Sequence, residues 1–160
     1  MASTSTNKQP LLVDRVFHST IKTDKLASGS STSVDVAGTN ASAVLLNCSA
    51  NDGAVIENIY TIARGTDART VNLYFSSSTD YLRADEGTFI GQFQSGTSIG
   101  TVTQWDSMPS VLAPSPKVGS DAQFKALYVP KGTVVWVTLQ EASSIDSAAN
   151  PIVGAQGGFY

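Results

Sequence analysis

The sequence predicts an all-β protein, because short apolar runs alternate with turn residues while helical periodicity is nearly absent. About eight strand-length runs rich in Val, Ile, Leu, Tyr and Phe are separated by clusters of Gly, Ser, Asn and Pro. This spacing is typical of a β-sandwich. We expect a jelly-roll-like sandwich, with an immunoglobulin-like sandwich as the alternative, since periodicity does not reveal the order of the strands.

The chain length of 160 residues indicates one domain with a core of its own. Residues 1–10 are polar and end at Pro10, so we expect an extended N-terminal arm outside the core. Residues 11–160 are then predicted to form a single β-sandwich domain, with early strands at 11–17 and 43–48.

Residues 54–63 and 70–75 are strand-like, and the charged hexapeptide Arg64–Arg69 lies between them. Alternation places one apolar set of the second run on a common face, namely Val71, Leu73 and Phe75. Gly65 and Asp67 are turn formers, so we expect a hairpin in which Asp67 accepts hydrogen bonds from the backbone or a guanidinium. The remaining functional reading is an ion pair to a neighbouring subunit.

Residues 124–140 give the clearest second hairpin of the sequence. Pro130 presets the backbone for a turn, Gly132 can adopt a positive φ, and strand-like runs flank both sides. The chain then ends in a glycine-rich strand closed by the aromatic residues Phe159 and Tyr160.

The charge of the chain limits the classes of partner. Charged residues make up 14% of the sequence, against about 25% in average proteins, and the formal net charge is −3. An acidic chain does not favour nucleic acid or anionic membranes, and no apolar run reaches the length of a membrane span or a signal peptide. We therefore expect neither nucleic acid nor membrane as a partner.

The side chains that could support catalysis are few. His18 is the single histidine, and the adjacent Ser19 would point to the opposite face of a strand, so we interpret His18 as a surface residue. Asp85 and Glu86 are read as solvated turn charges, and Cys48 as a small buried hydrophobe without a basic neighbour. We expect no enzyme activity, no catalytic residue, no cofactor and no metal.

The two tryptophans differ in their surroundings. Trp136 lies within the apolar run "VVWVTL" and is predicted to be in the core. Trp105 precedes Met108 and a proline-rich loop, which makes it the better candidate for an exposed contact such as stacking on a sugar. Packing of Trp105 beneath that loop is nevertheless the favoured interpretation.

Two stretches, "IYTIARGTDARTVNLYFSSS" and "ALYVPKGTVVWVTLQ", followed by the glycine-aromatic C-terminus, resemble small virion proteins of tailed bacteriophages, with cyanophage structural proteins as the nearest type. The resemblance covers roughly residues 55–160. It implies a non-enzymatic, β-structured particle component that is assembled in the host cytoplasm and resides in the virion. It carries over no catalytic residues.

From this resemblance we expect a capsid cement (decoration) protein that bridges capsomers as a homotrimer, with the major capsid protein or other virion proteins as partners. The alternatives are an accessory protein of the neck, tail or baseplate, and a lectin-like module that binds glycans through Trp105 or surface tyrosines. The candidate contact residues are Lys8, Pro10, Arg64, Arg69, Trp105, Met108, Phe159 and Tyr160.

Overall fold

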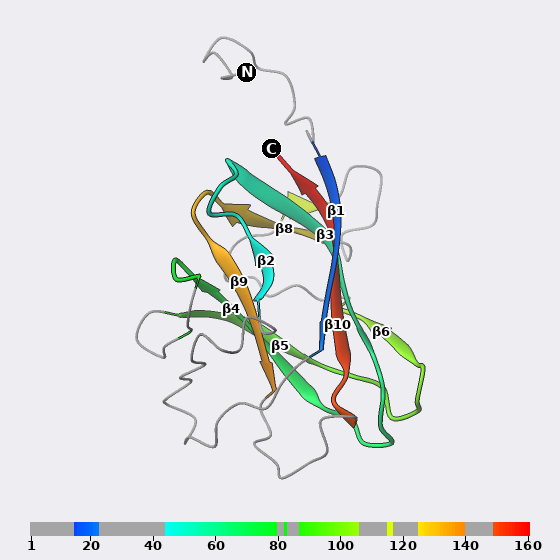
Figure 1. Cartoon of the computed structure of the whole chain (residues 1–160). Coiled ribbons are helices and arrows are strands. Elements are labelled where there is room, and N and C mark those ends of the chain that lie inside the picture. Colours follow the sequence, from blue (N-terminus) through cyan, green and yellow to red (C-terminus); the bar gives the residue numbers. More distant parts are fainter. Residues whose placement is uncertain are drawn as a thin grey trace.

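The computed structural model describes residues 15–22, 44–79, 82, 87–105, 115–116, 125–139 and 149–160. The arm with Lys8 and Pro10, the residues Asp85 and Glu86, and Met108 lie outside the described residues. Every element of regular secondary structure in the described part is a β-strand, and no α-helix occurs there (Figure 1). For the described residues, the prediction of an all-β fold is confirmed.

The strands form two antiparallel sheets. The first sheet has the order β1 (Arg15–Lys22), β10 (Ile152–Phe159), β3 (Gly53–Ile62), β8 (Lys125–Pro130) and β7 (Ser115–Pro116), and β6 (Val102–Gln104) pairs with the end of β3 that β8 leaves free. The second sheet has the order β2 (Val44–Asn47), β9 (Val134–Leu139), β4 (Thr70–Ser76) and β5 (Thr88–Gln94).

The strand pairs are nested along the chain. β1 pairs with β10, β2 with β9, β3 with β6 and β8, and β4 with β5. The two chain-terminal strands therefore lie side by side, and β1 begins where β10 ends (Figure 1). Two further pairings, β10 with β3 and β9 with β4, connect the nested pairs into the two sheets.

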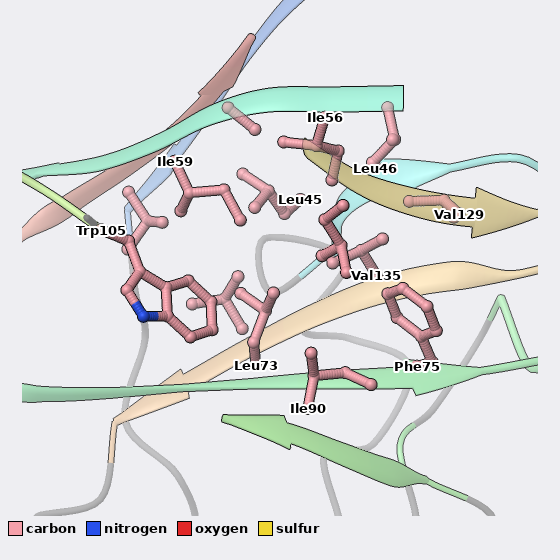
Figure 2. Packing of buried hydrophobic residues seen from close by; sticks show 14 of the residues in the cluster. Leu45, Leu46, Ile56, Ile59, Leu73, Phe75, Ile90, Trp105, Val129 and Val135 are labelled. Carbon is pink, nitrogen blue, oxygen red and sulfur yellow. The ribbon is translucent and has the colours of Figure 1, made fainter. Parts of the chain in front are cut away.

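The two sheets share one hydrophobic core. Buried side chains of β3 and β8 in the first sheet point toward those of β2, β4 and β9 in the second sheet (Figure 2). On β4 the buried apolar set is the one that alternation predicts, Val71, Leu73 and Phe75. Burial of such aliphatic and aromatic side chains is the main favourable term in the stability of a fold of this kind.

A β-bulge in β3 explains why two apolar residues three positions apart both face the core. Pairing with β10 shifts register between Gln156 and Gly157, which leaves Glu57 without a direct partner. Ile56 and Ile59 are consequently both fully buried while Glu57 is exposed. The backbones approach closely at this point: a Cβ on Gly157 would lie 1.9 Å from the carbonyl oxygen of Val55.

The predicted hairpin around Arg64–Arg69 is wrong, because β3 and β4 belong to different sheets. Residues 63–69 carry the chain from the first sheet to the second, and residues 95–101 carry it back. The amide of Ala63 donates to Thr101 and that of Ser95 donates to Arg69, each at 2.9 Å, so the two crossings continue existing strand pairs. Turn residues mark where a strand ends, but they do not specify which strand is its neighbour.

The second predicted hairpin is likewise wrong in its pairing, since β8 lies in the first sheet and β9 in the second. Its turn is as predicted: Gly132 has a φ of 76°, and the amide of Thr133 donates to the carbonyl of Pro130 at 3.2 Å. The turn also contacts the end of β2, because the amide of Cys48 donates to Thr133 at 2.9 Å.

A smaller cluster covers part of the outer face of the second sheet. Trp136 and Val134 of β9 are fully buried there against Leu82, and Val44 and Tyr74 pack around them. The indole Nε1 of Trp136 donates to the carbonyl of Ser78 at 3.1 Å. β9 is therefore buried on both of its faces, which confirms the predicted core position of Trp136.

Candidate interaction surface

Arg64 and Arg69 flank the crossing from β3 to β4, and Arg64 is half-buried. The guanidinium of Arg69 contacts the carboxylate of Asp67 at 3.5 Å, as expected for a residue placed to accept a hydrogen bond. The Arg69 side chain is 12% exposed, whereas that of Asp67 is 77% exposed. A neighbouring molecule would therefore meet the Asp67 carboxylate before the guanidinium of Arg69.

Trp105 is 8% exposed and belongs to the core between the sheets (Figure 2). Its indole stacks on the ring of Phe93, and its amide donates to the carbonyl of Ile59 at 2.9 Å. The favoured interpretation of Trp105 as a packing residue is confirmed. Its place among the candidate contact residues is corrected, because a buried indole offers no face to a ligand.

The C-terminal aromatics are half-buried at the end of the first sheet. Phe159 packs against Phe17, with ring centroids 5.0 Å apart, and the guanidinium of Arg15 lies 4.9 Å from the Phe159 centroid. Tyr160 lies over Gly53, where a Cβ would come within 2.8 Å of the tyrosine ring. Burial raises the pKa of Tyr160, which agrees with a ring packed against the domain.

The outer face of the first sheet, which points away from the core, carries the exposed side chains of β1, β3, β6 and β10. Strand register arranges them in rows across the sheet. One row contains His18, Gln156 and Asn58, and the next contains Thr20, Gly154, Tyr60 and Gln104. His18, Thr20, Gln104 and Gln156 are exposed, and Asn58 and Tyr60 are partly exposed.

Tyr60 and His18 connect two strands that are not neighbours. Tyr60 is on β3, His18 is on β1, and β10 lies between them. The Tyr60 hydroxyl and Nε2 of His18 are joined by a hydrogen bond, and a Cβ on Gly154 would lie 2.2 Å from Cζ of Tyr60. The Tyr60 side chain therefore crosses β10 in the space left by the missing side chain of Gly154.

The ends of this outer face are largely apolar. Ile152, Ile62 and Val102 form a row at one end, with Val102 55% exposed, and Lys22 of β1 is the register partner of Ile152 in the same row. Val16, which is 81% exposed, and Tyr128 lie in the row at the other end. Glu57 and Lys22 are the charged residues that the strand register places on this face. The surface is thus thinly charged, with uncharged polar rows between largely apolar ends.

The Cys48 thiol and possible metal ligands are the groups to consider for chemistry. The buried thiol of Cys48 has its pKa raised to about 11 by desolvation, which disfavours the nucleophilic thiolate. Within the described ranges, no three His, Cys, Asp or Glu side chains are grouped so that they could hold a metal ion. The described residues contain no helix that is long enough and apolar enough to cross a membrane.

Comparisons of the chain with protein-family models, with curated proteins and with solved structures find no match.

Sequence reasoning missed the outer face of the first sheet. It placed His18 at the surface correctly, but it did not connect His18 with Tyr60, because the two residues are 42 positions apart. The glycines of β10 were the available signal: Gly154 and Gly158 lie on one face, and the missing side chain of Gly154 leaves room for Tyr60.

Proposed function

We propose that this protein is a non-enzymatic structural component of a phage virion, and that it acts as a capsid cement protein with a jelly-roll sandwich fold. The observation that carries the proposal is the strand order β1-β10-β3, with β6 and β8 both paired to β3, in one sheet and β2-β9-β4-β5 in the other. Jelly rolls are a fold of viral capsid and lectin domains.

The nested pairing supports a jelly roll over an immunoglobulin-like sandwich. In the immunoglobulin order, strands adjacent in sequence are repeatedly neighbours in a sheet. Here β1 and β2, β2 and β3, and β3 and β4 each lie in different sheets, and only β4–β5 and β7–β8 join sequential strands among those described. The first strand pairs with the last, as when one long double-stranded ribbon is folded onto itself. In this reading β7 and β8 are an addition to the eight other strands.

The mechanism we propose is stabilisation by mass action. A subunit that binds only the assembled shell lowers the free energy of that shell relative to its free subunits. A homotrimer at a local threefold axis would let each protomer contact the major capsid protein. The thinly charged surface supports such a role, since the centres of protein interfaces are depleted in charged residues.

The proposal is tested by quantitative mass spectrometry of purified virions from the genome that encodes this chain, with the major capsid protein as the internal standard. We expect hundreds of copies per particle for a cement protein. A count from about six to a few dozen would instead assign it to the neck, tail or baseplate, by the symmetry of those assemblies. Absence of the chain from particles contradicts the proposal.

A second experiment tests whether the N-terminal arm contacts the particle. Deletion of residues 2–10, which include Lys8, is expected to lower occupancy on particles lacking the wild-type protein. Asp67→Asn tests in the same way whether the crossing beside Arg64 and Arg69 contacts the particle, because the Asp67 carboxylate is exposed. Unchanged occupancy after the deletion would reject a role for the arm.

A further inference from the structure

We propose that the outer face of the first sheet carries a binding site for a neutral oligosaccharide, centred on Tyr60 and its row partner Gln104. This site does not depend on the role in the virion proposed above. Tyr60 takes the place of Trp105 as the candidate for stacking on a sugar, because Trp105 is buried.

The first step of the argument is the orientation of Tyr60. Neighbouring strands are about 4.8 Å apart, so β3 and β1 are separated by roughly 10 Å across β10. A tyrosine on β3 that bonds to His18 on β1 must lie along the sheet rather than stand away from it. Gly154 makes this possible, because any side chain there would collide with the ring. The ring therefore lies over the backbone of Gly154 on the outer face, where Tyr60 is partly exposed.

The second step is that the ring is fixed before any ligand binds. The hydrogen bond to His18 and the contact with Gly154 restrict the Tyr60 side chain. A restrained aromatic side chain loses little conformational entropy on binding. Tyr60 is therefore suited to stack on the C–H face of a sugar ring, a contact that needs an apolar surface with a polar rim.

The third step is the chemistry around the ring. Gln104 is the register partner of Tyr60, and Gln156 and Asn58 form the adjacent row. Each of these amides offers both donors and an acceptor. Sugar hydroxyls are also both donors and acceptors, so the rows can bond a chain of them. Glu57 and Lys22 lie elsewhere on the face, and the two central rows themselves contain no Asp, Glu, Lys or Arg, which favours a neutral ligand over an anionic one.

A protein partner is the competing occupant, and it would be expected to cover the aliphatic row Ile152, Ile62 and Val102 rather than the amides. The centres of protein interfaces are rich in aromatic, Met and Arg side chains. The two central rows instead contain amides, a hydroxyl, an imidazole and one aromatic ring. The composition of these rows favours the saccharide.

The test is an array of neutral oligosaccharides built from glucose, galactose and N-acetylglucosamine in both anomeric linkages, probed with the full-length protein. We expect one group of these sugars to bind. Gln104→Ala is expected to weaken binding several-fold and Tyr60→Ala about tenfold, the order expected for loss of a stacked aromatic contact. Gln92→Ala, an exposed glutamine on β5 of the second sheet, is the matched control and should bind as wild type.

Thermal unfolding of each variant separates a local effect from loss of the fold, and Gln104→Ala keeps the test decisive if Tyr60→Ala unfolds. Failure of the wild-type protein to bind any sugar on the array overturns the proposal. So does equal binding by wild type and Gln104→Ala. If Gln104→Ala instead lowers occupancy on virions while no sugar binds, the face is a protein interface, and the proposed structural function stands without this site.

Discussion

The rings of Phe93 and Trp105 are stacked, with centroids 5.0 Å apart and planes within 10° of parallel. Phe93 belongs to β5 in the second sheet, and Trp105 follows β6 in the first. The stack therefore joins the two sheets beside the crossing at residues 95–101. Aromatic pairs contribute beyond the area they bury, so this contact helps to hold the two sheets together.

Trp105→Ala is expected to destabilise the protein by about 3–5 kcal/mol, because it removes a buried indole and leaves a cavity against Phe93. Trp105→Phe should cost about half as much, since it retains a ring. The measurement is urea unfolding followed by far-ultraviolet circular dichroism. Val102→Thr, at an exposed position of β6, is the control and should stay within about 0.5 kcal/mol of wild type. A loss below about 1 kcal/mol for Trp105→Ala would show that the stack does not hold the sheets together.

Gly157→Ala is expected to cost about 3 kcal/mol or more, because the new Cβ would lie 1.9 Å from the backbone oxygen of Val55 and neither strand can move away without breaking the pair. Gly132→Ala is the comparison. Its position has open space and a φ of 76°, so only backbone strain of about 1 kcal/mol is expected. Denaturant midpoints of the two variants check the order, and equal costs would contradict the close approach of β10 to β3.

The all-β class and the positions of several strands, among them those predicted at 54–63 and 70–75, could be predicted because they depend on local pattern. Alternation in residues 70–75 correctly assigned the buried face of β4, and Gly132 was correctly given a positive φ. The pairing could not be predicted in the same way. An alternating apolar and polar pattern fits a strand of either sheet. Which sheet the strand joins is determined by the packing of the core.

The candidate contact residues were predictable only in part, for a related reason. Trp105 follows a polar strand and precedes a proline-rich stretch, so its neighbours in sequence suggested exposure. Its neighbours in space, Phe93 and Ile59, come from other strands and determine its burial. The Tyr60 and His18 pair depends in the same way on β10 lying between β1 and β3.

Leu82→Ala is expected to destabilise the protein by about 2–3 kcal/mol, although Leu82 lies outside the main core. Its side chain is fully buried against Trp136 and Val134 on the outer face of the second sheet, and truncation would leave a cavity there. Phe89→Ala on the same sheet is the control: Phe89 is 48% exposed, and a loss of about 1 kcal/mol is expected. Tryptophan fluorescence should report the change at Trp136. Equal stability of wild type and Leu82→Ala would mean that this cluster does not stabilise the fold.

The thiol of Cys48 is expected to make stability fall as the pH rises from about 9 to about 11. Burial raises the pKa of the Cys48 thiol from its ordinary value of about 9 to about 11. Between these values the unfolded chain has released its proton while the folded protein retains it, so the unfolded state binds fewer protons and the free energy of unfolding decreases with pH. The contribution is fully present below pH 9 and is lost as the pH passes 11. Urea midpoints of wild type and Cys48→Ala should therefore converge over this interval, because the variant lacks the titrating group while Tyr74 and Tyr160 titrate in both proteins. Parallel curves, or rapid reaction of the folded protein with a thiol reagent at pH 8, would show that Cys48 is not desolvated.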